Sequence, residues 1–242
     1  MQPGAVGHRA SGEPRRLWPC MYMIPAIDTA TTHWDDDTFD DQLPAHLRTK
    51  SSVHFTPVAV AQFAARLLAP MPGTRVLDVG SGAGKFCLVA AQALPASTFV
   101  GVEYRQRLVA VAAELAARNR LANVEFVHAD AFDLDWADFD AFYFFNPFGE
   151  QLHHGYWFLD LTIEFCPSNY VKWVSAVRER LGQAPIGTRV VTYHGFGGPA
   201  PMGYDMISEH TYGSDRLELW VKNRPTHSIL VDESSEETGN AR

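Results

Sequence analysis

One short segment, Leu77-Asp78-Val79-Gly80-Ser81-Gly82-Ala83-Gly84, restricts the possible folds of this chain more than any other. The apolar residues before its glycines predict a buried strand, and the three alternate glycines predict a sharp turn into a helix. A second apolar run follows and ends at Glu103, 19 residues after the last glycine. Glycines let a backbone approach a ligand closely, and an acid at this position can accept hydrogen bonds from both ribose hydroxyls. The segment therefore predicts a nucleoside-binding site.

Lys85 distinguishes this turn from two other glycine-rich turns. A dinucleotide fingerprint requires glycine at position 85, where the chain has lysine. A phosphate-binding P-loop requires Ser or Thr at position 86 and Gly at position 79, where the chain has Phe86 and Val79. These departures argue against both turns. A NAD-dependent oxidoreductase on a Rossmann fold stays an alternative, because it shares the order of strand, glycine turn and acid.

The Gly-x-Gly-x-Gly spacing, with an aspartate two residues before it, resembles motif I of the class I, seven-stranded S-adenosylmethionine-dependent methyltransferases. The resemblance covers about residues 56 to 222 and implies S-adenosyl-L-methionine as the cofactor. It implies that Glu103 holds the ribose, that Tyr104 covers one face of the adenine and that Asp130 accepts from the adenine amine. The residues implied in cofactor binding are Asp78, Gly80, Ser81, Gly82, Gly84, Glu103, Tyr104, Asp130 and Ala131.

Strand-like and helix-like segments alternate along most of the chain, which predicts an α/β fold with a doubly wound, mostly parallel sheet and helices on both faces. Five strands are expected at Arg75–Val79, Thr98–Glu103, Val124–His128, Ala141–Asn146 and Arg189–Tyr193. Helices are expected at Val58–Leu68, Gly84–Leu94, Gln106–Arg120 and Tyr170–Leu181, with a less regular helical stretch around Gln151–Phe165. Two final strands, Met206–Tyr212 and Leu217–Lys222, predict a C-terminal antiparallel hairpin and a seven-stranded sheet. Ligands of such sheets bind beyond the carboxyl ends of the strands, so Gly80, Glu103, Asp130 and Asn146 should converge.

Asn146-Pro147-Phe148 follows the aromatic fourth strand and bears on the reaction type. It resembles a shortened Asn-Pro-Pro-Tyr/Phe motif of methyltransferases that act on amino or amide nitrogens. The resemblance implies that Asn146 and Pro147 accept hydrogen bonds from the target nitrogen while Phe148 stacks on a planar acceptor. Catalysis would then be positioning for an in-line displacement. The missing second proline weakens the interpretation as a nucleic-acid adenine N-methyltransferase, and an oxygen or carbon acceptor, with Asn146 in a structural turn, stays an alternative.

Three regions are expected in the chain. Residues 1–52 are expected to be an N-terminal extension with a partly disordered leader, and residues 225–242 a polar tail. The resemblance implies that residues 53–224 between them are the methyltransferase domain. The extension carries an acidic cluster that is expected to be a solvated surface, with a lid or a docking surface for a basic substrate as the alternative. The cluster consists of Asp35, Asp36, Asp37, Asp40 and Asp41.

The formal net charge of −8 argues against electrostatic binding of nucleic acid over a broad surface. The charge therefore favours a small-molecule or protein acceptor. The chain has no apolar run of membrane-spanning length, so no membrane partner is expected. Its three cysteines, Cys20, Cys87 and Cys166, have neither metal-site spacing nor a disulfide pattern, which favours a reducing cytoplasm and no metal. His194 is expected to be structural rather than a base. The oligomeric state is not predicted.

Overall fold

The computed structural model describes residues 32–146, 148–152, 158–159, 165–213 and 215–226 of the 242-residue chain. The predicted leader and most of the predicted polar tail lie outside these residues, as does Pro147. Within the described residues, no helix is long and apolar enough to cross a membrane.

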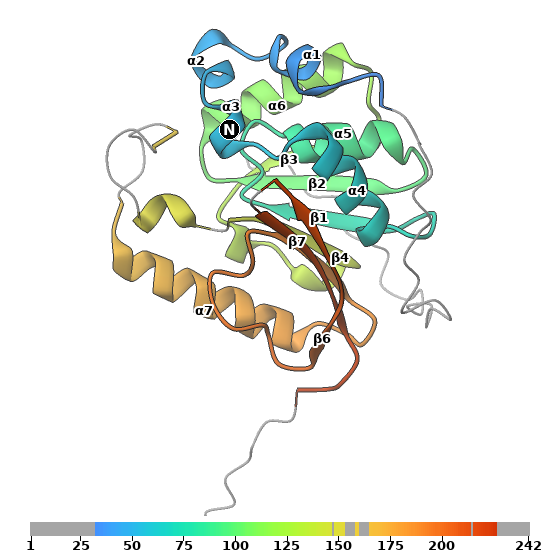
Figure 1. The fold of residues 1–242 in the computed structure, drawn as a ribbon, viewed down its shortest axis with the longest axis vertical. Coiled ribbons are helices and arrows are strands. Elements are labelled where there is room, and N and C mark those ends of the chain that lie inside the picture. The colour runs from blue at the N-terminus through green and yellow to red at the C-terminus, as the bar shows by residue number, and fades with distance from the viewer. Residues whose placement is uncertain (1–31, 147, 153–157, 160–164, 214, 227–242) are drawn as a thin grey trace, which may run out of the picture.

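A seven-stranded sheet forms the centre of the molecule (Figure 1), with the strand order β3-β2-β1-β4-β5-β7-β6. The strands are β1 (Arg75–Val79), β2 (Thr98–Glu103), β3 (Val124–His128), β4 (Ala141–Phe145), β5 (Arg189–Tyr193), β6 (Tyr204–Tyr212) and β7 (Asp215–Lys222). The first five are parallel, whereas β7 pairs antiparallel with both β5 and β6. The predicted fold class is confirmed, and the strand order reverses direction between β1 and β4, where ligands of such sheets bind.

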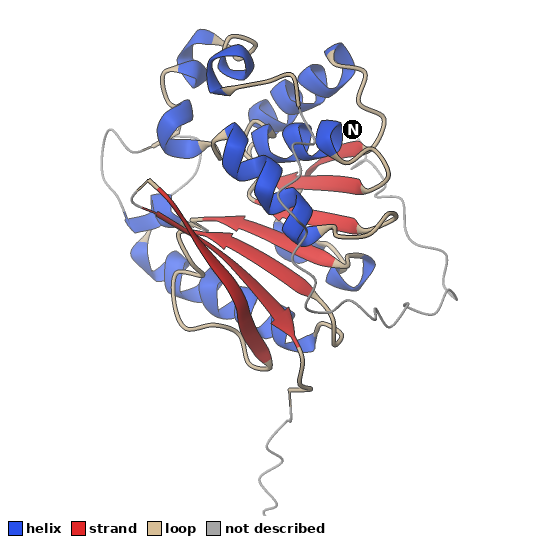
Figure 2. Cartoon of the chain, turned by 45° about the vertical axis from the view of Figure 1, so that its right-hand side comes forward, coloured by secondary structure: helices blue, strands red, loops and turns tan. Residues whose placement is uncertain are grey.

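Helices cover both faces of the sheet, as Figure 2 shows from a second direction. The helices α4 (Val58–Leu68), α5 (Lys85–Ala93) and α6 (Gln106–Arg118) share one hydrophobic cluster with one side of the sheet. The longer α7 (Pro167–Gln183) packs on the other side, where Leu181 joins a second cluster. Alternate residues of β1 serve the two clusters, because Val76 belongs to the first and Leu77 to the second.

The glycine turn between β1 and α5 is confirmed in its backbone conformation. Gly80, Gly82 and Gly84 all have positive φ values, of 80°, 56° and 82°, which other residues adopt at a cost. A Cβ atom on Gly84 would lie 2.5 Å from the Phe126 ring and 2.8 Å from Ala112. The last glycine therefore lets α5 begin in close contact with β3 and α6.

The acidic segment differs from the expected solvated extension. It forms three short helices, α1 (Asp36–Asp40), α2 (Ala45–Arg48) and α3 (Ser51–His54), which bury Phe39 and Leu47. The ammonium of Lys85, itself 2% exposed, lies 2.7 Å from Asp36 and 2.8 Å from Asp40. Two of the five carboxylates therefore neutralise a buried cation on α5, and the segment is packed onto the domain.

Candidate active site

A cavity of about 730 Å³ lies along the carboxyl ends of the parallel strands. Its size falls within the range of small-molecule sites. Gly80, Glu103, Asp130 and Asn146 all line it, so the predicted convergence at this edge is confirmed. Residues 52–55 of the N-terminal segment close one side of the same cavity.

Glu103 is held rigidly at the end of β2. One carboxylate oxygen accepts the backbone N–H of Gly82 at 3.1 Å, and the other accepts the backbone N–H of Arg105 at 2.9 Å. The side chain is buried, and this burial raises its pKa, while the Arg105 guanidinium and the two backbone hydrogen bonds act in the opposite direction. A carboxylate has about four acceptor positions, so both oxygens keep capacity for ligand hydroxyls.

The residues expected around an adenine also reach the cavity. Tyr104 is 64% exposed and lines it, which leaves a ring face open to a ligand. Asp130 caps the short helix η1 (Ala131–Asp133) by accepting the backbone N–H of Phe132 at 2.9 Å, and it lines the cavity together with Ala131. Asp130 therefore has a structural contact in addition to its exposure to the cavity.

Three residues of the turn lie behind the cavity lining. Gly84 contacts Phe126 as described above, and the Ser81 hydroxyl is buried without a hydrogen-bond partner among the described residues. Asp78 is buried and accepts a hydrogen bond from the Cys87 thiol at 3.5 Å. Burial, with a smaller contribution from nearby Glu103, raises the pKa of Asp78 to about 7, although the Cys87 hydrogen bond opposes the rise.

Asp78 leads to a prediction about stability and pH. An acid whose pKa is higher in the folded protein binds its proton more tightly there, so the free energy of unfolding should fall as the pH rises from 3.8 to about 7. Asp78→Asn should make this fall shallower, because asparagine does not titrate. Urea unfolding at several pH values measures the slope, with Asp133→Asn, at an exposed position, as the control. Equal slopes for wild type and Asp78→Asn would contradict the prediction.

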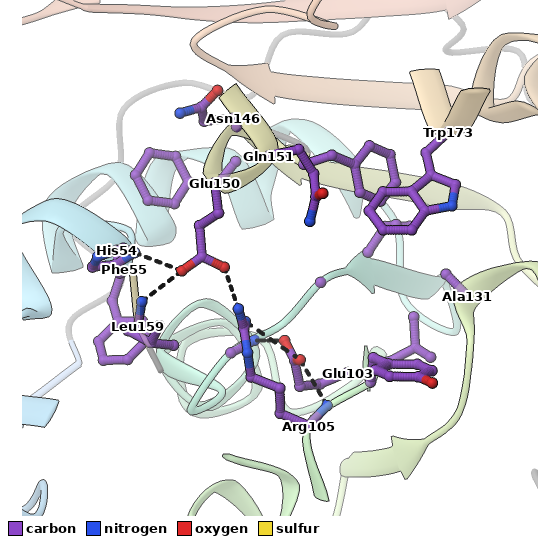
Figure 3. Close-up of a pocket in the computed structure, with 18 of the residues that line it drawn as sticks. His54, Phe55, Glu103, Arg105, Ala131, Asn146, Glu150, Gln151, Leu159 and Trp173 are labelled. Carbon is purple, nitrogen blue, oxygen red and sulfur yellow. Dashed lines mark hydrogen bonds and ion pairs between the residues drawn. The ribbon is translucent and has the colours of Figure 1, made fainter. Parts of the chain in front are cut away.

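A cluster of charged side chains closes the cavity over Glu103 (Figure 3), and the sequence interpretation missed it. Arg105 contacts Glu103 at 3.8 Å and donates to Glu150. Glu150 also accepts the backbone N–H of Leu159 at 2.7 Å and lies 3.8 Å from Nδ1 of His54. Burial lowers the pKa of His54, and Glu150 partly offsets that effect. Arg105 and Glu150 follow the ends of β2 and β4, so the rule that placed Glu103 could have put both residues at this edge of the sheet, but it could not have predicted that they pair.

The opposite half of the cavity contains the residues expected at the acceptor. Asn146 is exposed and lines the cavity, and its amide folds over Gly149, where a Cβ would come within 2.5 Å of it. Figure 3 shows this amide pointing away from Glu103. Phe148 lines the cavity and lies 5.2 Å from the ring of Trp173 and 6.4 Å from that of Phe132. Pro147 lies outside the described residues.

Backbone strain is concentrated beside this half of the cavity. Asn146, Phe148 and His194 have φ values of 42°, 62° and 73°, in the region that disfavours residues with a Cβ. All three line the cavity. Such strain is commonly retained at functional sites, where the surrounding structure holds it in place.

His194 makes a close contact with a carboxylate that the sequence interpretation did not anticipate. Its Nδ1 atom lies 2.9 Å from a carboxylate oxygen of Asp215, at the start of β7. Both residues line the cavity. The ring also contacts Phe145 and Tyr193, with centroid distances of 5.2 and 4.5 Å.

Comparisons with known proteins match the part of the chain that contains the glycine turn. Residues 70–155 match a family described as a methyltransferase domain. The 23S rRNA (uracil(1939)-C(5))-methyltransferase RlmD of Azoarcus sp. strain BH72 is 41% identical over 134 residues, which is 55% of this chain and 28% of that relative. The chain thus matches well under a third of the relative's length.

Two solved structures share the fold. TrmN from Thermus thermophilus aligns with a TM-score of 0.54 at 22% identity, over 69% of this chain and 49% of TrmN. The mitomycin 7-O-methyltransferase MmcR aligns with a TM-score of 0.53 at 13% identity, over 80% of this chain and 62% of MmcR. The matched family segment contains the glycine turn, Glu103 and Asn146, and the sheet has the expected seven strands. The chain has the fold of the class I, S-adenosylmethionine-dependent methyltransferases.

Proposed function

We propose that this chain transfers a methyl group from S-adenosylmethionine to a nitrogen atom of an acceptor held between Asn146 and Phe148. The observation that supports it is one continuous cavity with two chemically different halves. Glycine backbone and a buried acid lie at one end, and aromatic rings with a strained asparagine lie at the other.

The cofactor half suits a nucleoside that carries an amino-acid chain. Gly80 and Gly82 would let the ligand lie against the backbone, and Glu103 would accept both ribose hydroxyls. Tyr104, Asp130 and Ala131 would surround the adenine. Asp78, Ser81 and Gly84 would shape the turn from behind it. S-adenosylmethionine supplies an electrophilic methyl group on a sulfonium.

The acceptor half suits an acceptor that is planar or that carries a positive charge. Phe148, Trp173 and Phe145 offer ring faces, which stack on planar groups and attract ammonium ions. Asn146 could accept a hydrogen bond from the attacking nitrogen and so direct its lone pair. A protein side chain or a small molecule therefore fits this half, and the net charge of −8 suits a cationic acceptor.

RNA is the second candidate acceptor, because the rRNA methyltransferase relative is 41% identical over the aligned part. Carbon 5 of uracil is a weak nucleophile unless a nucleophile first adds to the ring, and enzymes often use a cysteine thiolate for such additions. Among the described residues no cysteine lines the cavity: Cys87 is buried beside Asp78. This arrangement favours nitrogen transfer over carbon transfer.

Labelled cofactor distinguishes these acceptors. The full chain is incubated with S-[methyl-³H]adenosylmethionine and separated protein, RNA and small-molecule fractions of a cell lysate. We expect label in the protein or the small-molecule fraction, as N-methyl groups identified by mass spectrometry. Label confined to the RNA fraction would support the second candidate.

Asn146→Ala tests the role of the strained asparagine. If Asn146 accepts a hydrogen bond from the reacting nitrogen, turnover should fall about tenfold to a hundredfold, corresponding to about 1.5–3 kcal/mol. Calorimetric affinity for S-adenosylmethionine should stay near that of wild type, because the amide points away from Glu103. Unchanged turnover would favour an oxygen or carbon acceptor, with Asn146 structural.

A further inference from the structure

His194 and Asp215 come together through the C-terminal hairpin. His194 directly follows β5, and its backbone N–H donates to the carbonyl of Arg216 at 3.2 Å. This bond extends the antiparallel ladder in which Tyr193 pairs with Leu217. The extended ladder brings Asp215 beside the imidazole, with its carboxylate 2.9 Å from Nδ1.

The geometry of the pair determines which ring nitrogen faces a ligand. A carboxylate accepts hydrogen bonds, so Nδ1 carries the hydrogen and Nε2 keeps its lone pair when the ring is neutral. Within the described part of the chain Nε2 makes no hydrogen bond, and about a third of each side chain remains exposed. His194 and Asn146 both line the cavity, and the backbone N–H of Asn146 donates to the carbonyl of Tyr193, the residue before His194, at 2.9 Å.

We infer that His194 is the catalytic base that removes a proton from the acceptor amine, and that Asp215 is the positioning residue that holds its ring. The inference rests on the proposed function. An amine arrives as an ammonium ion, which the rings of Phe145 and Tyr193 and the charge of Asp215 attract. An ammonium has no lone pair, so it must lose a proton before it attacks.

Nε2 of His194 takes one proton from the ammonium and becomes an imidazolium stabilised by Asp215. The freed nitrogen lone pair forms the new bond to the methyl carbon, and the electron pair of the methyl–sulfur bond stays on sulfur, which becomes a neutral thioether. The imidazolium returns its proton to solvent through its exposed edge.

Burial, rather than the neighbouring charge, favours a neutral His194 ring before the reaction. Burial lowers the pKa of His194, and Asp215 partly offsets this effect. On the described strands, the neighbouring titratable groups are Tyr193 on β5, Tyr212 opposite Asp215 on β6, and Arg216 on β7. Arg216 contacts Glu209 at 3.2 Å and Glu218 at 3.9 Å, so its charge is already paired.

Nuclear magnetic resonance of the ¹⁵N-labelled full chain tests the ring without an acceptor. We expect the Nδ1–H tautomer and a pKa below 6.5 for His194. Asp215→Asn should lower that pKa further, because the carboxylate that favours the imidazolium is gone. An Nε2–H tautomer in the wild type, or an unchanged pKa in Asp215→Asn, would overturn the inference.

The second part of the test measures the rate of methyl transfer to the lysate fraction that wild type labels. His194→Gln should reduce transfer about 10²- to 10⁴-fold and remove the low-pH limb of the rate profile. Calorimetric affinity for S-adenosylmethionine should be unchanged. His46→Gln, at an exposed position on α2, is the control and should transfer like wild type.

Failure of the proposed function and failure of His194 as the base give different results. If wild type binds the cofactor but labels no fraction, the proposed function fails and the base fails with it. If wild type labels an amine and His194→Gln does so at the same rate and with the same pH profile, only the base is overturned.

Discussion

Glu103→Ala is expected to reduce the affinity for S-adenosylmethionine by about 10²- to 10⁴-fold. Each of two ribose hydroxyls would lose a hydrogen bond to a charged acceptor, worth about 1.5–3 kcal/mol. The backbone N–H groups of Gly82 and Arg105 would also lose their acceptor, which would loosen the glycine turn. Isothermal titration calorimetry measures the effect directly.

Two further variants complete this test. Gly82→Arg should also abolish binding, because even a Cβ there would lie 3.0 Å from the Phe55 ring at a positive φ. Glu114→Ala, on the exposed face of α6, is the matched control and should bind like wild type. Wild-type affinity in both Glu103→Ala and Gly82→Arg would contradict the assigned cofactor site.

The double variant Asp36→Asn, Asp40→Asn is expected to lower the free energy of unfolding by about 3–5 kcal/mol. Both substitutions remove carboxylates from the ammonium of Lys85, which is almost fully buried. A buried cation without a counter-charge is costly because it has lost its hydration. Urea unfolding followed by circular dichroism gives the free energies.

A third substitution distinguishes charge burial from simple loss of contacts. Adding Lys85→Met to the double variant removes the buried charge and should restore most of the lost stability. Asp37→Asn, on the exposed side of α1, should change stability by less than about 0.5 kcal/mol. A double variant as stable as Asp37→Asn would contradict the structural role of this cluster.

The strands of the sheet were predictable because each one is specified by a local run of residues. Buried parallel strands are continuous apolar runs, and β1, β2, β3 and β5 have the predicted bounds. The start of α7 was less predictable: Pro167 occupies its first turn, so the helix begins before the apolar pattern does.

The candidate site was predictable only where residues follow strand ends. That rule brought Glu103 and Asn146 to one cavity. The pairing of Lys85 with Asp40 spans 45 residues, and that of Arg105 with Glu150 spans another 45. No local pattern encodes such contacts, because each depends on how separate elements pack. The contact of His194 with a carboxylate likewise depends on the register of β5 and β7.

The packing of Lys85 has a thermodynamic consequence for the cofactor. Ser51, whose hydroxyl lies 2.7 Å from Asp40 and 3.2 Å from Lys85, immediately precedes the residues that wall the cavity. Displacement of the N-terminal helices would therefore also disturb the wall of the cavity, and a coupling between two such equilibria is reciprocal. A bound nucleoside would hold α1 to α3 in place, and a polycation that competes for the α1 carboxylates would weaken nucleoside affinity without entering the cavity.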